Sequence, residues 1–396
     1  WVWYYTTQTS LRIVLLAYTN KAVDEICEAL HASGQEISDH YIRIGSRAAT
    51  GEPFRHRLLE QVIEPMTTRA EIKHKLEQTR IFVATVSSMQ GKSELFHLIP
   101  FDVAIMDEAS QLLEPAVVGL LTRFKKTILI GDHMQLPAVS MQPERMSRIK
   151  PGQDWCERIG ITDMSMSYFE RLYRLYQARG WHHLIGILKE QGRMHTDIMR
   201  FANQHVYQGI LQVVDHHRQG ASFSELFDGE TSALFKQRLL YVPSSARLEE
   251  TYLKTNQQEA AITISLVSIW LEKIKANKLN WSIGVITPFR AQIAAITYLA
   301  HLQNVDLSHV TIDTVERYQG GARDIIIMSS AVNSQQALSR ITSENSDGVD
   351  RKLNVAVTRA RQQFILIGSE AILQTASAYK SLIGMCGRLE NNVIDG

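Results

Sequence analysis

Residues 101–111 read FDVAIMDEASQ, an apolar run at 103–106 that ends in the adjacent acids Asp107 and Glu108. A short apolar run bounded by polar residues is typical of a buried β-strand. Ligands bind at the carboxyl ends of strands in open α/β sheets, so both acids would face a site. Asp107 is suited to hold Mg²⁺ beside a nucleotide's phosphates, and Glu108 to orient or deprotonate the attacking water. Two acids at a solvated strand end are the alternative.

A second segment repeats this layout further along the chain. Residues 127–137 read TILIGDHMQLP, in which an apolar run is followed by a turn and by polar side chains. Gly131 can adopt the turn because glycine carries no Cβ. The amide of Gln135 can sense a γ-phosphate or the attacking water. Since the two polar clusters end neighbouring candidate strands, each supports the other.

Short apolar runs alternate with longer helical patterns along the chain, which favours parallel sheets covered by helices. The remaining strand candidates are residues 12–17, 81–84, 283–286, 325–329 and 364–367. Two helical segments, 22–30 and 260–274, carry apolar residues on one face and should pack on a sheet. The stretch 334–349 is rich in Ser, Asn, Asp and Gly, which indicates an exposed loop. The predicted fold class is therefore α/β.

The length and charge of the chain limit its organisation. Its 396 residues, 45% hydrophobic and 21% charged, suffice for two domains of about 150 to 200 residues each. The strand signal fades from about Met141 to Ile187, where the aromatic helix at 168–176 favours packing over base stacking. We therefore divide the chain into domains 1–187 and 188–396. With 42 basic and 41 acidic residues, any affinity for nucleic acid must come from local grooves.

Several classes of protein are disfavoured. Cys27, Cys156 and Cys386 stand far apart, without metal-ligand spacing or the even count of a disulfide framework, which indicates a reducing, cytoplasmic location. The longest apolar runs fall far short of the ~20 residues of a membrane span, so we expect no membrane partner. The histidine pairs at 182–183 and 216–217 would point apart on a helix, which favours surface residues over a metal site.

Further segments complete a series of motifs. They are YTNKAVD at 18–24, QGRMH at 191–195, TPFRAQ at 287–292, TVERYQG at 314–320 and RKLNVAVTRAR at 351–361. Together with the two segments above, they resemble, in order, the motifs of superfamily 1 helicases of the nonsense-mediated-decay type. That type is related to the replication helicase-nucleases that process Okazaki fragments. The resemblance covers nearly the whole chain, and chance does not explain so many motifs in family order.

The resemblance implies two tandem RecA-like P-loop NTPase domains with parallel sheets. They would hydrolyse ATP at their interface and move along single-stranded DNA or RNA. The residues implied on the nucleotide side are Asp107, Glu108, Asp132, Gln135, Gln191, Arg193, Gly320 and Arg359. Asp107 would bind Mg²⁺ with ATP. Arg193 and Arg359 would be arginine fingers, which can be worth ~10³ to 10⁵ in rate.

The resemblance also implies a set of nucleic-acid contacts. These residues are Thr19, Asn20, Thr287, Pro288, Arg290, Gln292 and Thr314. The segments at 18–24 and 287–292 each follow a candidate strand, so their residues would hold the nucleic-acid backbone at the carboxyl ends of the sheets. Thr314 belongs to the segment TVERYQG at 314–320.

The pattern departs from the family in one essential place, because the phosphate loop G-x-x-x-x-G-K-[ST] is missing. GKS at 91–93 resembles its tail, but Val86 stands where the first glycine belongs, so we reject it. In the family the loop lies shortly before motif Ia, which the segment YTNKAVD at 18–24 resembles. We therefore expect it upstream of Trp1, with possible additional domains, or replaced by residues 1–11. The inferred first domain is truncated, and its absent central strand would leave two strands with unpaired edges.

Two other interpretations stay open. A chain that naturally lacks the phosphate loop would be a catalytically inactive nucleic-acid-binding module. A chain from a broken gene would be a truncated remnant of such a helicase. The intact Asp107, Glu108, Arg193 and Arg359 favour an active ancestor. The segment TVERYQG at 314–320 resembles motif V of the family. That motif usually has an acid two residues after its glycine, where this chain has Ala322, which puts a ribose contact in doubt.

Overall fold

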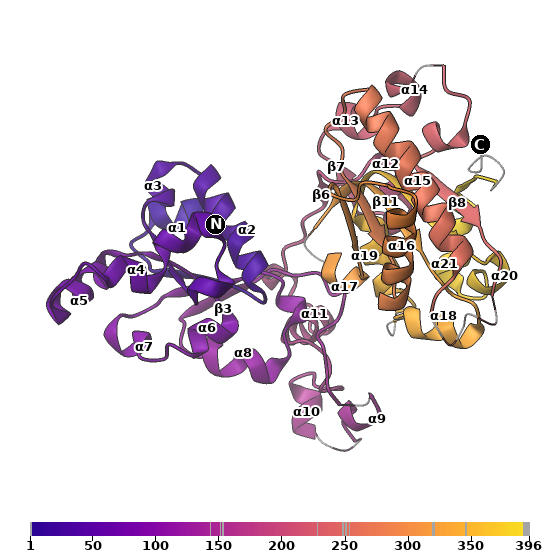
Figure 1. Ribbon diagram of the computed structural model, residues 1–396. Helices are drawn as coiled ribbons and strands as arrows, with labels where there is room; N and C mark the ends of the chain where they lie inside the picture. The colour runs from indigo at the N-terminus through magenta and orange to yellow at the C-terminus, as the bar shows by residue number, and fades with distance from the viewer. Residues whose placement is uncertain are drawn as a thin grey trace. The chain divides into compact units, whose positions relative to one another are not determined.

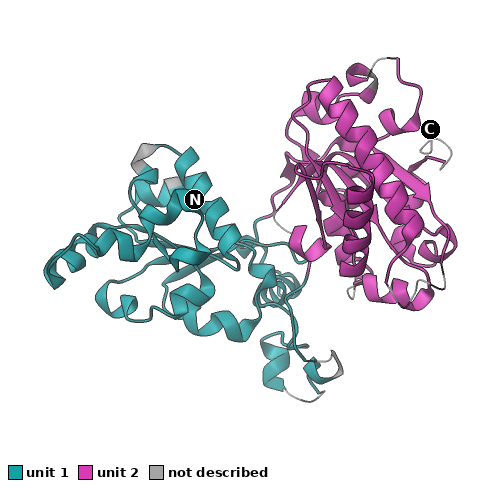
Figure 2. Ribbon diagram, in the orientation of Figure 1, with its two compact units in different colours: residues 1–133, 137–186 teal, residues 134–136, 187–396 magenta. Residues whose placement is uncertain are grey.

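The computed structural model describes residues 2–142, 144–150, 152, 154–227, 229–247, 249, 252, 254–318, 321–344 and 347–390. The chain forms two compact units (Figure 1, Figure 2). The first unit comprises residues 1–133 and 137–186, and the second comprises residues 134–136 and 187–396. Each unit has a parallel sheet with helices on both faces, so the predicted α/β class is confirmed.

The first unit is built on a five-stranded parallel sheet in the order β2-β3-β1-β4-β5. Its strands are β1 (Ile13–Ala17), β2 (Tyr41–Ile44), β3 (Ile81–Thr85), β4 (Val103–Met106) and β5 (Lys126–Leu129). Alternate residues of β1 serve opposite faces: Leu16 packs in one core, and Leu15 packs in the other. The sequence predicted β1, β3, β4 and β5 to within one residue at each end.

The expectation of unpaired strand edges beside a missing central strand is wrong. Strand β4 pairs directly with β5, from Val103 opposite Lys126 to Met106 opposite Leu129. The backbone groups of β4 therefore find their partners in β5, as buried backbone groups must. The sheet is continuous across the described residues, and β5 forms its edge, with Lys126 exposed.

Helices cover both faces of this sheet (Figure 1). The helices are α1 (Val2–Gln8), α2 (Asn20–Ala32), α3 (Gln35–Ser38), α4 (Leu59–Ile63), α5 (Arg69–Gln78), α6 (Val86–Gln90), α7 (Leu95–Leu98), α8 (Glu114–Leu121), α9 (Glu144–Ser147), α10 (Asp154–Arg158) and α11 (Tyr168–Ala178). Helix α2 buries Val23, Cys27 and Leu30 against β1 and β3, so its predicted apolar face is confirmed. Helices α6, α7 and α8 contribute to the core on the opposite face.

The second unit is built on a six-stranded parallel sheet in the order β10-β9-β11-β12-β8-β13. Its strands are β8 (Leu239–Pro243), β9 (Ile283–Ile286), β10 (Val310–Asp313), β11 (Arg323–Ser329), β12 (Ala360–Gly368) and β13 (Gly387–Arg388). A separate small sheet pairs β6 (Glu190–Gln191) with β7 (Gln212–Val213). Ile326 and Ile327 of β11 lie in opposite cores, one on each face.

The helices of the second unit again divide between two faces. They are α12 (Thr196–His205), α13 (His216–Gly220), α14 (Phe223–Leu226), α15 (Gln257–Ala276), α16 (Arg290–Leu302), α17 (Val315–Tyr318), α18 (Gln335–Ile341), α19 (Arg351–Thr358), α20 (Glu370–Leu373) and α21 (Ser377–Met385). Helix α15 buries Ile264, Val267 and Trp270 on the sheet, which confirms its predicted face. Helices α12, α19 and α21 line the other core.

The prediction of an exposed loop at 334–349 is wrong in its first half. Residues 335–341 form α18, whose N-cap Ser334 accepts a hydrogen bond from the backbone N–H of Ala337. Leu338 and Ile341 of this helix are buried in the core. The serine that indicated a loop is thus a helix cap. None of the helices in the described ranges is both long and apolar enough to cross a membrane.

Candidate functional site

The two polar clusters around residues 107 and 131 lie together, as predicted, because β4 and β5 are neighbours. Ile130 donates from its backbone N–H to Met106 O at 2.8 Å, and Ala109 donates to Ile130 O at 2.8 Å. A Cβ on Gly131 would lie 2.9 Å from the backbone nitrogen of Ser110, closer than side chains pack. Glycine at 131 therefore permits the two turns to touch.

The acids Asp107 and Glu108 emerge from β4 in a strained turn. Glu108 adopts the left-handed conformation with φ of 52°, which costs a non-glycine residue about 1–3 kcal/mol and is common at functional sites. Asp107 Oδ1 accepts from Glu108 N–H at 2.9 Å, and Glu108 Oε2 accepts from Gln111 Nε2 at 2.7 Å. These bonds fix both carboxylates at the end of the strand.

A third acid belongs to this neighbourhood, and sequence reasoning missed it. Burial raises the pKa of Glu25 on α2, Lys21 opposes the shift, and the charges of Asp107 and Glu108 add to it. Only the fold brings Glu25 near Asp107 and Glu108, so no local sequence signal could have identified Glu25. The described part of the chain contains no cluster of three or more potential metal ligands. The carboxylate of Asp107 fits Mg²⁺ as a single protein oxygen ligand, the kind that shares the ion with phosphate oxygens.

The rejection of residues 91–93 as a phosphate loop is confirmed. Gly91 is the C-cap of α6, so the GKS sequence ends a helix and does not join a strand to a helix. Residues 2–8 form helix α1. Arg80 donates to the carbonyls of Tyr5 at 2.6 Å and of Thr6 at 2.7 Å, which anchors the end of that helix.

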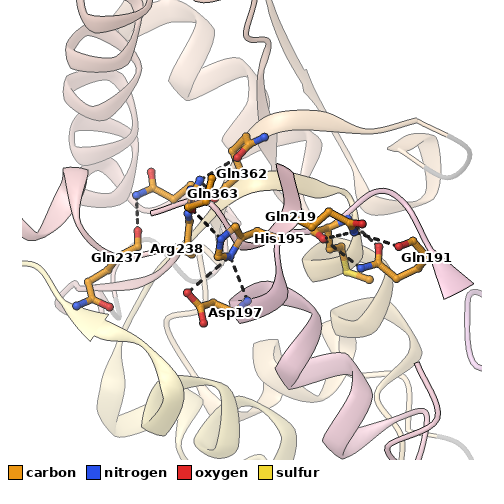
Figure 3. A network of polar contacts seen from close by, with 10 residues as sticks. Gln191, His195, Asp197, Gln219, Gln237, Arg238, Gln362 and Gln363 are labelled. Carbon is orange, nitrogen blue, oxygen red and sulfur yellow. Dashed lines mark hydrogen bonds and ion pairs between the residues drawn. The ribbon is translucent and has the colours of Figure 1, made fainter. Parts of the chain in front are cut away.

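In the second unit, two glutamines shape the turn that carries the predicted finger Arg193 (Figure 3). Gln191 Oε1 accepts from the backbone N–H groups of Arg193 at 3.0 Å and Met194 at 2.8 Å. Gln219 donates to Gln191 O at 3.0 Å and to Met194 O at 2.8 Å. Arg193 itself is exposed. Gln191 was predicted to bind the nucleotide; in this structure its amide is engaged within the turn.

Gln219 is a residue that the sequence did not single out. It is buried, and its Oε1 also accepts from Val214 N–H at 3.1 Å and from Asp215 N–H at 2.9 Å. Both N–H groups and both acceptor positions of its side-chain amide are thus bonded to backbone groups. Its partners lie on separate segments, so only the folded structure could reveal this role.

The next residue of the motif, His195, is held as a neutral ring (Figure 3). Its Nδ1 accepts from Asp197 N–H at 3.1 Å, and its Nε2 lies 3.0 Å from Ala221 O, to which it donates in that tautomer. Burial lowers the pKa of His195, and the nearby charge of Arg238 lowers it further. Arg238 lies 3.6 Å over the ring of Phe223, and burial lowers its pKa to about 10.

The second predicted finger, Arg359, follows α19 and points into its own unit. Its side chain is 2% exposed. It donates to Val355 O at 3.2 Å, to Gly321 O at 3.3 Å and to Gln135 Oε1 at 3.3 Å. Gln135 and its two neighbours pack with the second unit, where Asn354 donates to Met134 O at 2.9 Å.

The predicted nucleic-acid contacts divide into exposed and buried residues. Thr19 and Asn20 are exposed at the start of α2, where Thr19 Oγ1 caps the helix by accepting from Ala22 N–H at 3.2 Å. Arg290 is exposed at the start of α16. Pro288 and Thr314 are half-buried. Of the residues predicted on the nucleotide side, Asp132 is half-buried, and Gly320 lies outside the described residues.

Thr287 and Gln292 are fully buried, so we correct their prediction as direct nucleic-acid contacts. Gln292 Nε2 donates to Asn256 O at 3.0 Å and to Ser329 Oγ at 3.1 Å, while its Oε1 accepts from Asn256 N–H at 2.9 Å. The amide therefore ties α16 to α15 and β11. Gln292 is two residues after Arg290, so the two side chains point to different faces of α16.

The same network contains a buried carboxylate. Glu259 of α15 accepts from the Ser329 hydroxyl at 2.9 Å and from Ala331 N–H at 2.8 Å. Burial raises its pKa to about 7, although these hydrogen bonds oppose the shift. The network holds the segments that follow β9 and β11.

Comparisons with known proteins agree with the motif series. A family model described as an AAA domain matches residues 164–371, and a second model of the same description matches residues 55–143. The Arabidopsis thaliana DNA replication ATP-dependent helicase/nuclease JHS1 is 27% identical to this chain, over 91% of this chain and 25% of that protein. The Saccharomyces cerevisiae DNA polymerase alpha-associated DNA helicase A is 29% identical, over 76% of this chain and 44% of that protein.

The chain therefore spans only a part of the length of the curated relatives it matches. Among solved structures, the PRRSV helicase is similar at 14% identity and a TM-score of 0.43, covering 93% of this chain and 49% of that one. The first family model spans more than half of this chain. The chain belongs to this AAA-domain family, and it is similar to DNA2-like helicases of superfamily 1.

Proposed function

We propose that the chain is a motor part of an ATP-dependent helicase that hydrolyses ATP with Mg²⁺ and moves along single-stranded DNA or RNA. One observation carries this proposal: Asp107 and Glu108 end β4 directly beside the Gly131 turn that ends β5. Acids at adjacent strand ends are the arrangement that phosphoryl-transfer sites use for the metal and the attacking water.

The roles follow from the positions of the acids. Asp107 would hold Mg²⁺, which neutralises charge on the phosphates when it is bound. Glu108 would accept a proton from the attacking water or orient it, and its bond to Gln111 Nε2 aims the carboxylate. Asp132, in the turn beside them, would help to hold the nucleotide.

The arginines would stabilise the charge that develops on the transferred phosphoryl group. Arg193 is exposed on a turn whose backbone is held by Gln191 and Gln219, which supports a finger that needs little rearrangement. Arg359 is bound to Gln135. We propose that γ-phosphate replaces Gln135 as the partner of Arg359 and that this exchange couples nucleotide state to motion.

Thr19, Asn20, Pro288, Arg290 and Thr314 are proposed to contact the nucleic-acid backbone. Backbone contacts position a strand and do not read its sequence. The buried Gln292 and Thr287 would support this surface from below. The three cysteines are free thiols, which supports a reducing location such as the cytoplasm.

The alternative to the motor is a nucleic-acid-binding module without catalysis. The sequence contains no G-x-x-x-x-G-K-[ST] segment, and residues 2–8 are helical. A chain that works without such a loop would be a nucleic-acid-binding module without catalysis. This alternative keeps the proposed nucleic-acid contacts and abandons the roles of Glu108 and Arg193.

The deciding experiment measures ATP hydrolysis by the purified chain with and without single-stranded DNA or RNA. Glu108→Gln is the matched variant, because it keeps the size of the side chain and its hydrogen bond to Gln111. Hydrolysis that rises with nucleic acid and disappears in Glu108→Gln supports the helicase motor. Absent hydrolysis with retained binding of single strands makes this chain alone a gripping part, whose hydrolysis requires a phosphate loop that it does not contain.

A further inference from the structure

A cavity of about 490 Å³ lies in the first unit, on the segment that follows the strands of its sheet. Helices α10 and α11 contribute to its wall. Its lining consists of Trp155, Arg158, Ile159, Arg171, Leu175 and Arg179. None of these residues belongs to the motifs discussed above. We call this cavity the Trp155 pocket.

The floor of the Trp155 pocket is held by Arg171, which is buried. Its guanidinium forms a two-pronged ion pair with Glu114, in which both N···O distances are 2.7 Å. It also donates to Ile159 O, which ties α11 to the end of α10. The charge of Arg171 is therefore compensated, and its role here is structural.

A glycine with positive φ forms the turn after α10. Gly160 has φ of +75°, and a Cβ at this position would lie 3.4 Å from the side chain of Leu175. Ile161 N–H donates to Cys156 O at 2.9 Å, which closes the turn after α10. The turn after α10 is thus held by this backbone hydrogen bond and by the bond from Arg171 to Ile159 O.

Two arginines at the Trp155 pocket remain available for a ligand. Arg158 and Arg179 are exposed, and Arg179 donates to Arg158 O. Within the described ranges, neither arginine forms an ion pair with a carboxylate, although α10 also carries the exposed acids Asp154 and Glu157. The lining itself contains no acid, so it attracts an anion.

The same pocket offers the aromatic surface of Trp155. Its side chain is 58% exposed, an unusual state for a large apolar ring. Arg179 lies 4.9 Å over the ring of Trp181, which is outside the lining and whose centroid is 5.8 Å from that of Tyr176. Exposed rings beside guanidinium groups are the elements with which proteins hold single-stranded nucleic acid.

We propose that the Trp155 pocket is a binding site for single-stranded nucleic acid. A base stacks on Trp155, and Arg158 and Arg179 contact the phosphates on either side of it. An acidic peptide would satisfy the arginines but would leave the flat face of Trp155 unused, so the observations favour nucleic acid. This inference rests on the proposed function, because it adds a contact for the same class of ligand.

The test measures binding of the full chain to fluorescently labelled 20-nucleotide oligo-dT and oligo-U by anisotropy. Trp155→Ala is expected to weaken binding about 5- to 100-fold, the range for loss of one stacked base. Trp155→Phe keeps a ring and is expected to recover most of that loss. The double variant Arg158→Gln/Arg179→Gln is expected to lower the slope of log K against log salt by about 1.4, at about 0.7 for each lost phosphate contact.

The matched control is Arg123→Gln, an exposed arginine of the same unit outside the pocket. It is expected to leave binding unchanged. The thermal unfolding temperature of every variant is measured as well. Since the substituted side chains are exposed, this temperature should stay close to that of the wild type. Arg290→Gln, in the second unit, separates the pocket from the proposed function, because its effect does not depend on the pocket.

Pocket variants that bind like the wild type, while Arg290→Gln weakens binding, overturn the Trp155 pocket and leave the helicase proposal standing. A wild-type chain that binds neither oligonucleotide overturns both. A glutamate-rich peptide that binds the wild type but not Trp155→Ala or the double variant, with oligonucleotide binding unaffected, assigns the pocket to a protein partner instead. A full loss of binding in Trp155→Phe as well as Trp155→Ala also counts against stacking.

Discussion

The guanidinium of Arg359 donates to the side-chain oxygen of Gln135 at 3.3 Å, inside the second unit. The segments 127–137 and 351–361 each supply one of these residues, and both residues are proposed to respond to the same γ-phosphate. Arg359 is nearly inaccessible and also donates to carbonyls of its own unit. A phosphate must therefore compete with Gln135 for this arginine.

The first prediction concerns the strength of that contact. Gln135→Glu should replace a charge-assisted hydrogen bond by an ion pair and hold Arg359 more firmly, since such pairs are stronger. ATP hydrolysis should fall at least about tenfold, which is about 1.4 kcal/mol, while thermal stability is kept or raised. The control is Gln142→Glu, an exposed residue. Unchanged hydrolysis in Gln135→Glu would show that the contact has no part in coupling.

Gln219→Ala should damage the turn that carries Arg193. The substitution leaves two backbone N–H groups and two carbonyls without this partner, and one buried unpaired group costs about 1–3 kcal/mol. Chemical denaturation should show at least that loss, with Gln336→Ala, an exposed position, as control. Arg193→Ala should instead lose hydrolysis, about 10³-fold or more, and keep its stability. Equal stability of Gln219→Ala and the wild type would contradict this account.

The stability of the second unit should depend on pH through Glu259. Its pKa is raised from 4.5 to about 7 in the folded state, so the folded chain binds more protons than the unfolded chain between these values. Stability therefore falls as pH rises from about 4.5 to about 7, by roughly 3 kcal/mol for this group. Urea unfolding of Glu259→Gln and wild type at several pH values isolates this term, because His195 contributes equally to both. Parallel pH profiles of the two proteins would refute it.

Gly131→Ala should separate the two turns at the ends of β4 and β5. The new methyl group would lie 2.9 Å from Ser110 N, and overpacking of this kind costs about 1–3 kcal/mol. Gly119→Ala is the control, since nothing lies within 4 Å of its added Cβ in helix α8. That variant should gain up to about 1 kcal/mol from helix propensity. Urea denaturation distinguishes the two, and a neutral Gly131→Ala would contradict the close approach.

The sequence predicted strands at most apolar runs, but it missed β8 (Leu239–Pro243), which is apolar throughout, and strands that contain a polar residue. Strand β2 was missed because its Arg43 looks like a surface residue, yet the side chain is fully buried and paired with Asp24. Strand β10 was missed because it is short and ends in Asp313. A charged residue can lie in a buried strand when it pairs with a residue from another segment, as Arg43 does with Asp24. Local composition does not reveal such a partner.

The candidate site also contains features that the sequence predicted and features that it did not. The neighbourhood of Asp107 and Gly131 was predictable, since each ends an apolar run and parallel strands align their ends. The inward direction of Gln292 and Arg359 was not predictable, because it depends on partners from other segments. Motif membership identified these positions, while burial determines which side chains can reach a ligand.

Residues 134–136 pack with the second unit although the segments on either side of them belong to the first. Leu136 is buried in the core of the second unit, and Asn354 and Arg359 hold the two residues before it. A fragment that starts at Ile187 would therefore carry a hole in its core and two polar side chains deprived of their partners. A fragment designed to express the second unit alone should therefore include residues 134–136. A protease site placed between them and Ile187 would separate the unit from part of its core.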